Sequence, residues 1–439
     1  MPKLKYIVHL CGKFNKIPIL KTNDYIMKNF TFIKRVYRLI SYIIQICALP
    51  VVVSCTSPGM FVRSMGNIDF VKNDSIVTLE SMFESFQLIP LENSRACMLN
   101  DVQKMQVMGD NIYILDQKPT HQLHIFGTDG RYKGLVGAQG HAKNEYTWLF
   151  DFCTKDDSAV CVLDFWNKIK IYDKNGKYIK TGELDTDNYF WTLDYYKGKY
   201  VITSLHNSTS KSFNKRDNLI YFFDENFKLI DEKIQLPEKL MNMSPFNRQP
   251  SLCFFDNKCL YYDLFQNKFF TFNMDDLSYQ DEYDVKTPNS HTYDDFANVE
   301  QYNIFGKTMD RIMYTFCDGN KIYGMMGYEK GISYYELDMK DKKAKVYGNL
   351  CFANVNNLTS YNGYVYGIIK QESLIQIQKT HEMHLPTFCK SLENAINQHK
   401  DRLGESNNYF VVKMKPRKHT LFYNKEELYK SEGITIIQK

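Results

Sequence analysis

The sequence lacks the motifs that identify a catalytic or metal centre. It contains no Cys-x-x-Cys pair, so a zinc site built from cysteines has no support. It also has no defensible Ser-His-Asp arrangement and no glycine-rich phosphate loop. We therefore assign no catalytic residue and no metal ligand from motifs.

Acidic residues are almost absent from the first 54 residues, which hold nine Lys and Arg side chains but one acid, Asp24. The rest of the chain has 46 basic and 49 acidic side chains, a net charge of about −3. The formal net charge of +5 is thus a property of the leader. A nucleic-acid footprint requires a basic face on the folded domain, so we exclude nucleic acid as a partner.

Tight turns of Gly, Asp and Asn recur along the chain between runs rich in aromatic and β-branched residues. These residues tolerate the positive φ angles of hairpin turns. The turns are Gly109–Asn111, Asp156–Asp157, Lys197–Gly198, Asp256–Asn257, Asp318–Asn320 and Asn362–Gly363. One position from each (110, 157, 198, 257, 319 and 363) gives steps of 47, 41, 59, 62 and 44 residues. A period near fifty residues is typical of one four-stranded sheet per repeat.

Two consecutive repeats are near copies of each other. Asn111–Asp116 and His124–Tyr132 in the first correspond to Ala159–Asp164 and Lys170–Tyr178 in the second. The second strand of each unit is apolar on both faces, as expected for a strand between neighbouring blades. We predict an all-β, six-bladed β-propeller with four-stranded blades, whose strands we call a to d. A β-sandwich of the same hairpins is the alternative, although a sandwich does not require a copied unit.

The basic leader, residues 1–54, ends in a signal-peptide pattern. Lys34–Arg38 precedes fifteen uncharged residues, 39–53, a run too short for a membrane span of roughly 20 residues. Cys55 follows where a lipoprotein signal places its modified cysteine, although the lipobox is imperfect. We expect translation to start at Met27, a signal peptide over 27–54, lipidation of Cys55 and a lipid-anchored tether over 55–75. A membrane-anchored N-terminus or an uncleaved peptide is the alternative.

The eleven cysteines do not form a disulfide framework. Cys153 and Cys161 flank one a–b turn, and Cys253 and Cys259 flank another. Counting back from two-residue turns, Cys253 lies opposite Leu260, so each pair is offset by one position and its side chains point to opposite faces. We predict buried free thiols in strands. Disulfides, which an exported chain could form, are the alternative.

The first two repeats resemble a known family. Ile68–Phe70, Ser85–Glu92, Asn111–Asp116 and Phe126–Arg131 are similar to the six-bladed β-propeller lipoproteins of Gram-negative gut bacteria, relatives of the NHL-type propellers. Val136–Tyr146 resembles their Gly-x-x-Gly-x-Gly-Pro-Gly-Glu-Tyr loop, with substitutions at its centre. The resemblance covers about residues 68 to 415. It implies an exported, lipid-anchored, six-bladed propeller from a family without a settled activity.

The resemblance also implies how the ring closes. Gln87–Leu91 would complete the last blade, which is built from Tyr364–Lys370 and Tyr409–Lys415, so that no sheet edge stays exposed there. A helical insertion around Thr387–Arg402 interrupts that blade. The predicted propeller thus spans 76–415, and residues 416–439 form a C-terminal extension.

Blade topology places the d–a and b–c connections on one face, which we call the loop face, and the tight turns on the opposite turn face. The long insertions therefore share the loop face, where such scaffolds usually bind. Trp166 is the candidate stacking platform, whereas Trp148 and Trp191 are expected to pack between blades. Three strand-ending aspartates point to this face, and capping of the b–c turns is their alternative role. The candidate ligand-binding residues are Asp116, His141, Glu145, Tyr146, Asp164, Trp166 and Asp263.

These observations predict a non-catalytic binding or scaffold protein of the cell envelope, monomeric and attached to the membrane only through its lipid. Its loop face would recognise a peptide, a glycan or an envelope protein, without a cofactor unless the aspartates hold a divalent cation such as calcium. The rival is a metal-dependent propeller enzyme, a lyase or lactonase with its site over the central channel. That rival requires His or carboxylate groups at equivalent inner positions of several blades. His381 and His384 share a helical turn but lack a third ligand.

Overall fold

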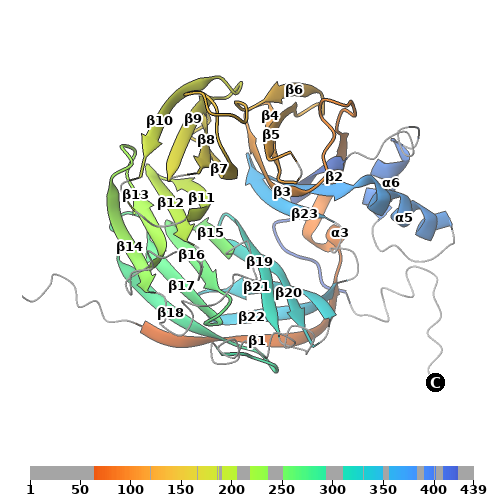
Figure 1. The fold of residues 1–439 in the computed structure, drawn as a ribbon. Coiled ribbons are helices and arrows are strands. Elements are labelled where there is room, and N and C mark those ends of the chain that lie inside the picture. Colours follow the sequence, from red (N-terminus) through yellow and green to blue (C-terminus); the bar gives the residue numbers. More distant parts are fainter. Residues whose placement is uncertain are drawn as a thin grey trace, which may run out of the picture. The chain divides into compact units, whose positions relative to one another are not determined.

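Short antiparallel strands joined by the predicted tight turns build the sheets of this protein (Figure 1). The computed structural model describes residues 64–118, 120–165, 167–184, 186, 190–204, 218–235, 251–292, 310–329, 331–349, 355–382, 390–399, 401 and 409–423. Residues 63–439 form one unit by their contacts. The leader and Cys55 lie outside the described residues. Among the residues that are described, no helix is long and apolar enough to cross a membrane.

Three four-stranded sheets follow one another along the chain. They are β3 (Val102–Met108), β4 (Asn111–Asp116), β5 (Gln122–Gly127) and β6 (Tyr132–Leu135); β7 (Leu149–Lys155), β8 (Ala159–Asp164), β9 (Lys168–Asp173) and β10 (Tyr178–Glu183); and β11 (Phe190–Tyr196), β12 (Lys199–Ser204), β13 (Asn218–Phe223) and β14 (Leu229–Gln235). Each sheet has the order of its sequence, as an antiparallel meander does. The turns adopt the positive φ that their residues predict, for example 49° at Asn362 and 73° at Gly363.

A nine-stranded sheet follows, in which two further four-strand series are joined by an N-terminal strand. The series are β15 (Ser251–Phe255), β16 (Lys258–Asp263), β17 (Lys268–Asn273) and β18 (Tyr279–Lys286), and β19 (Arg311–Asp318), β20 (Lys321–Tyr328), β21 (Gly331–Asp338) and β22 (Lys343–Asn349). Strand β1 (Ser64–Val77) pairs in parallel with β18 and with β22. The tether predicted over 55–75 is therefore wrong from residue 64 onward, because Ile68 and Phe70 are buried in the sheet.

The last sheet confirms the predicted closure by an early segment. Its order is β2 (Phe83–Pro90), β25 (Tyr409–Pro416), β24 (Tyr364–Lys370) and β23 (Asn356–Tyr361). Gln87 lies opposite Lys413, as the resemblance implied. Helices α5 (Gln371–Glu382) and α6 (Lys390–Asn397) lie between β24 and β25, which confirms a helical insertion, although it begins earlier in the chain than expected. The short helix α3 (Leu79–Met82) precedes β2.

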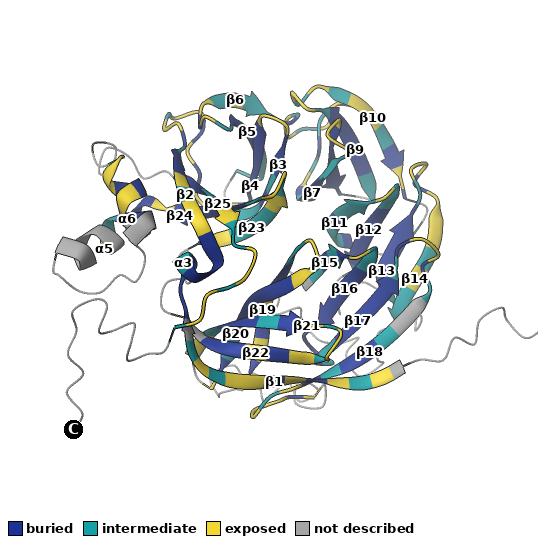
Figure 2. Ribbon diagram, turned by 180° about the vertical axis from the view of Figure 1, so that it is seen from behind, coloured by how far each residue is buried: buried dark blue, intermediate teal, exposed yellow. Residues whose placement is uncertain are grey.

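Hydrophobic side chains fill the spaces between successive four-strand series. The strands that carry them are largely coloured as buried in Figure 2. Ile112 and Ile114 of β4 pack with Ile89 and Val411 of the last sheet. Tyr113, on the other face of β4, packs with the sheet that contains β8. The second strand is thus buried on both faces, as predicted, and the last sheet packs against the first.

Residues 417 and 421 of the C-terminal extension form backbone hydrogen bonds with α3. The Arg417 N–H donates to the Met82 carbonyl (2.7 Å), and the Leu421 N–H donates to the Ser81 carbonyl (2.8 Å). The Phe422 ring stacks on Tyr347 with a centroid separation of 5.1 Å. Residues 424–439 lie outside the described part of the chain.

The cysteine predictions were partly wrong. Cys253 lies opposite Leu260 as predicted, but it forms a disulfide with Cys317, which the sequence reasoning did not pair with it. This bond joins β15 to β19, the two ends of the nine-stranded sheet. Cys153 lies directly opposite Cys161, because residues 156–158 form a three-residue turn rather than a two-residue one. Both thiols are buried and free, which is the predicted state.

Candidate functional site

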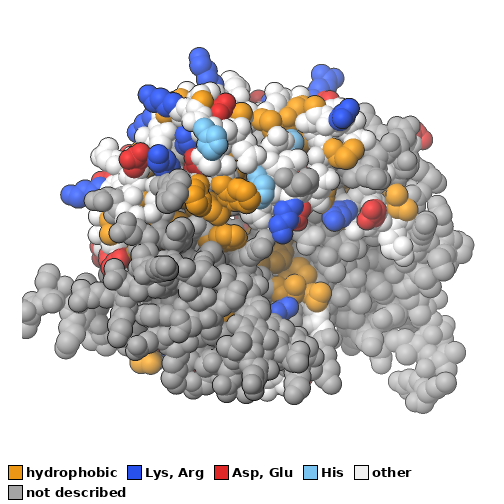
Figure 3. Space-filling view, viewed as in Figure 1, with side chains coloured by type: hydrophobic (Ala, Val, Ile, Leu, Met, Phe, Trp, Pro, Cys, Tyr) orange, Lys and Arg blue, Asp and Glu red, His pale blue; other side chains and the backbone are white. Residues whose placement is uncertain are grey.

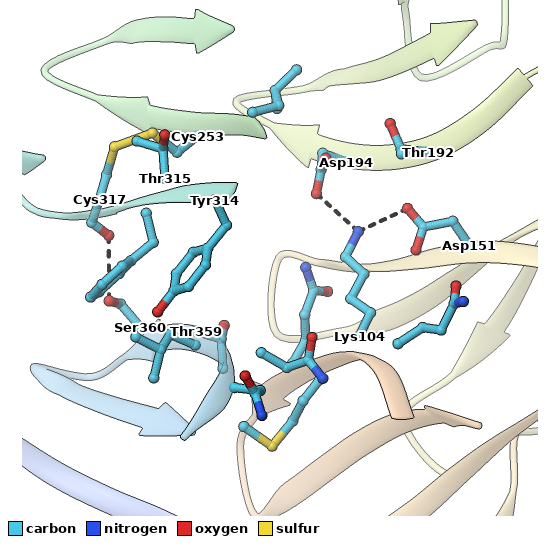
Figure 4. A pocket seen from close by; sticks show the side chains of 18 of the residues that line it. Lys104, Asp151, Thr192, Asp194, Cys253, Tyr314, Thr315, Cys317, Thr359 and Ser360 are labelled. Atoms are coloured by element: carbon cyan, nitrogen blue, oxygen red, sulfur yellow. Dashed lines mark hydrogen bonds and ion pairs between the residues drawn. A yellow bond between two sulfur atoms is a disulfide. The ribbon is translucent and has the colours of Figure 1, made fainter. Parts of the chain in front are cut away.

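The first strand of each four-strand series contributes to the wall of a central cavity of about 520 Å³. These inner strands are β3, β7, β11, β15, β19 and β23. Figure 4 shows the lining side chains converging from them. The volume lies within the range of roughly 300–1,000 Å³ that small-ligand sites occupy. The cavity is therefore the candidate site that we analyse.

A β-bulge near the start of the inner strand recurs around this cavity. In five of the strands, the pairing with the second strand shifts by one residue: four of them skip a single residue, and β23 places two residues, 357 and 358, against one of β24. Bulges turn a side chain out of the ladder and are frequent beside binding sites. Because strand a runs from the loop face to the turn face, the bulges lie at the loop-face end of the cavity. Residues at the bulges line it: Gln103, Phe150, Trp191, Met313, Asn357 and Leu358.

Aromatic rings and uncharged polar groups make up most of this lining. Phe150 and Trp191 have their ring centroids 5.6 Å apart. Phe254 stacks on Tyr196 at 4.6 Å and 3°. The Tyr314 hydroxyl is buried and has no hydrogen-bond partner among the described residues. Amide and hydroxyl groups complete the wall: Gln103, Gln106, Thr192, Thr315, Asn356, Asn357, Thr359 and Ser360.

One lysine and two carboxylates form a polar cluster in the wall. The Lys104 ammonium lies 3.0 Å from Asp151 Oδ2 and 3.1 Å from Asp194 Oδ1, and it donates to the Leu193 carbonyl at 2.9 Å (Figure 4). Asp151 Oδ2 also accepts the Leu193 N–H at 2.7 Å. The cluster thus connects β3, β7 and β11, which belong to three successive sheets.

Burial and the attraction between opposite charges have opposite effects on the pKa values in this cluster. Burial would lower the pKa of Lys104, but the carboxylates of Asp151 and Asp194 outweigh it and hold that pKa above its ordinary value. Burial raises the pKa of Asp194 to about 6, although Lys104 opposes the shift. Burial raises the pKa of Asp151 as well. At neutral pH, Lys104 is therefore protonated and Asp194 is predominantly ionised.

The three predicted aspartates hold loop backbone. Asp116 accepts hydrogen bonds from the Asn100 and Asp101 N–H groups and from the Thr120 hydroxyl. Asp263 accepts from the Phe265 N–H and the Gln266 amide. Asp164 Oδ1 accepts from three N–H groups, those of residues 147, 148 and 165. These contacts match the alternative role predicted from the sequence, which is capping of the b–c turns. In addition, Asp116 and Asp164 hold the connection that precedes strand a of their own sheet.

Among the other predicted site residues, Tyr146, Glu145 and His141 do not line the cavity either. Tyr146 is fully buried in the core between the first two sheets. Glu145 accepts the Ala142 N–H at 3.0 Å, and His141 is exposed in the same loop. Trp166 lies outside the described residues. Sequence reasoning missed the cavity wall itself, including Trp191, which was expected only to pack.

Metal-ligating side chains do not gather in the part of the chain that the structure describes. No group of three or more His, Cys, Asp or Glu there could hold a metal ion. His121 packs instead against Trp148, with ring centroids 4.1 Å apart. His124 is buried, and neither ring nitrogen has a hydrogen-bond partner among the described residues. His384 lies outside the described residues.

Hydrogen bonds connect neighbouring turns on the turn face. The Tyr361 hydroxyl accepts the Gly109 N–H at 2.8 Å and donates to Asp157 at 3.0 Å. Lys197 donates to Asn257. On the face seen in Figure 3, hydrophobic side chains gather near the centre beside basic and histidine side chains.

The DUF4934 family, described as a domain of unknown function, matches residues 65–415. The chain belongs to this family. The match runs from β1 into β25 and thus includes every strand of the cavity wall. The sequence-based resemblance to a propeller family covered nearly the same residues, but the NHL relationship is not shown. No curated protein matches the chain.

A solved structure shares the fold of this DUF4934 chain over most of its length, and two others superpose on it less well. A Bacteroides fragilis protein assigned to the exported class superposes with a TM-score of 0.60 at 13% identity, covering 81% of this chain and 100% of that one. The Pan2 WD40 domain of Neurospora crassa gives 0.39 at 10%, covering 73% and 76%. BamB of Moraxella catarrhalis gives 0.32 at 10%, covering 71% and 71%. The fold is all-β and propeller-like.

Proposed function

We propose that this protein is a non-catalytic binding propeller of the cell envelope that takes a peptide, a glycan or part of an envelope protein into its central cavity from the loop face. The recurring bulge carries the proposal. An added residue in five inner strands brings amphipathic side chains to one end of a single cavity, and a packing role alone does not require this.

A six-bladed ring accounts for the sheet topology. Strands β15–β18 and β19–β22 are then two blades, and β1 lies along the outer strands of both. The other sheets supply four more blades, of which the last is closed by β2. In this arrangement, the aspartates at positions 116, 164 and 263 position the loops around the mouth. His141 and Glu145 are the proposed rim contacts of a bound ligand, and Trp166, which lies outside the described residues, remains a predicted contact.

Export is supported by the disulfide between Cys253 and Cys317. Disulfides persist in oxidising compartments such as the periplasm and the cell surface. The assignment of the Bacteroides fragilis protein to the exported class is consistent with this location. We propose that lipidation of Cys55 anchors the mature, monomeric protein in the envelope. A palmitate analogue should label the wild type and not Cys55→Ala, and equal labelling of both would exclude the anchor.

Binding can be tested by screening peptides and glycans for a rise in the melting temperature of the full mature chain. Trp191→Ala should weaken the binding of any hit by about 1–3 kcal/mol, because a stacked aromatic anchor is lost. Trp148→Ala is the matched control, since this residue is 41% exposed but does not line the cavity. Equal weakening by both variants, or by neither, would contradict a cavity site.

A further inference from the structure

We propose that the central cavity recognises a basic peptide segment, whose protonated amino group pairs with Asp194. This inference rests on the proposed binding function and assigns a chemical class to its ligand. It is drawn from the charges of the cavity wall, from the unused oxygen of Asp194 and from the rings beside it.

The wall carries an excess of negative charge. Lys104, Asp151 and Asp194 are its only charged residues among those described, so two carboxylates face one ammonium. An uncharged ligand would displace water and leave the excess charge poorly solvated, which is costly in a low-dielectric site. A cationic ligand would neutralise it.

Lys104 has no donor left for an anionic ligand. Its ammonium has three N–H donors, and its partners are Asp151, Asp194 and the Leu193 carbonyl. A carboxylate or phosphate would therefore meet Asp194 without a free cationic donor to receive it. This observation excludes an acidic peptide as the preferred ligand.

Asp194 still has an acceptor available. Its Oδ1 receives Lys104, whereas its Oδ2 has no hydrogen-bond partner among the described residues and belongs to a side chain that lines the cavity. Asp151 is less accessible to a ligand, because its side chain is 8% exposed whereas that of Asp194 is 21% exposed. Asp194 is thus the carboxylate that can accept a charge-assisted hydrogen bond from a ligand.

The surroundings of Asp194 suit a lysine side chain. Trp191 precedes it on β11 by three residues, and Phe150 lies against Trp191. Aromatic faces attract ammonium groups and also cover the apolar stem of a lysine. Across the cavity, Tyr314 adds a further aromatic ring to the wall. The lining therefore offers apolar contact for the stem and the Asp194 carboxylate for the head.

Calorimetric titration of the full mature chain tests this assignment at neutral pH and physiological ionic strength. The probes are tetralysine, the same peptide with acetylated side chains and amino terminus, glucosamine and N-acetylglucosamine. We expect tetralysine to bind and its acetylated form to bind at least about tenfold more weakly, since one charge-assisted contact is lost. Asp194→Asn should weaken tetralysine binding by a similar factor. Glu183→Gln removes one charge from the outer strand β10 and should leave the affinity unchanged.

Three results would overturn the inference. The first is equal binding of acetylated and free tetralysine by the wild type, a comparison that needs no variant to fold. The second is binding of glucosamine without binding of tetralysine. The third is a neutral hit from the peptide and glycan screen whose binding depends on Trp191 but not on Asp194. That last result would leave the proposed binding function intact.

Discussion

At the residue scale, Lys104 is the most highly connected charged side chain of the cavity wall. One ammonium is held by carboxylates from two neighbouring sheets and by a backbone carbonyl. Buried ion pairs contribute little net stability, but removing one member leaves the others uncompensated. The cluster therefore holds three inner strands in register as long as it is complete.

We predict that Lys104→Met destabilises the fold by about 3 kcal/mol, because Asp151 and Asp194 would repel each other in a poorly solvated wall. Urea unfolding measures the change. Lys174→Met, at an exposed position of a tight turn, should cost much less. Adding Asp194→Asn to Lys104→Met should restore part of the loss, and no restoration would show that the lysine acts through packing instead.

His124 should make the fold sensitive to mild acid. Burial lowers the pKa of this imidazole below its ordinary value near 6.5. Below that pH, the unfolded chain binds a proton at this histidine more readily than the folded chain does. The free energy of unfolding therefore falls as the pH decreases through this range. The slope is at most about 1.4 kcal/mol per pH unit for one proton.

His124→Phe should remove this part of the slope. Between neutral pH and mild acid, the melting temperature of the wild type should fall more steeply than that of the variant. Parallel curves would show that the buried histidine does not contribute. The exposed His141 provides a control, because replacing it with Phe should not change the slope.

The loop face could be predicted from the sequence better than the residues that line the cavity could. Asp116 and Asp164 were recognised because they end strand b, but a sequence does not show that their oxygens would be used by backbone N–H groups. Trp191 was missed because it stands at a bulge, and bulges depend on pairing register. A usable signal existed in Lys104, Asp151 and Asp194, which are charged residues in the inner strands of three successive repeats.

At the element scale, β1 and β2 are the two early strands that complete late sheets. The closure by β2 could be predicted, since Gln87–Leu91 carries a recognisable motif. Strand β1 was missed, because Ser64–Val77 follows the segment predicted to be a tether and lacks a regular alternation of apolar and polar residues. Its buried side chains become apparent only when β18 and β22 stand on both sides of it.

Truncation should separate the roles of these strands. A chain that begins at Ser64 should melt like the wild type. A chain that begins at Thr78 loses β1 with Ile68, Phe70 and Val77, each worth about 1.5–3 kcal/mol of burial, and should be destabilised by several kcal/mol.

A chain that begins at Glu92 also loses β2, which exposes the edge of β25 and should promote aggregation. Thermal melting and size-exclusion chromatography measure both effects. Wild-type melting of the Thr78 chain as a monomer would show that β1 is dispensable.

At the scale of the whole molecule, two links join the β15–β18 series to the β19–β22 series of the nine-stranded sheet. Strand β1 joins the outer strands, and the Cys253–Cys317 disulfide joins the inner ones across 64 residues.

Reduction of the disulfide should destabilise the protein by about 4 kcal/mol, from the loop-closure entropy of a link of that length. Melting with and without dithiothreitol measures the loss. The Cys253→Ala, Cys317→Ala variant should not respond to the reductant, and an unresponsive wild type would contradict the role of the bond.

The parallel strap of β1 and the closing strand β2 also constrain the order of events during biosynthesis. Ser64 pairs with Asp281, and Gln87 pairs with Lys413, so both early strands wait for partners that are synthesised hundreds of residues later. Such long-range pairing makes folding slow. A chain that cannot complete its fold until its last strand is available stays unfolded for longer, and an unfolded chain can pass through a narrow channel. This delay suits the proposed export, in which the polypeptide passes through a membrane translocon before it folds.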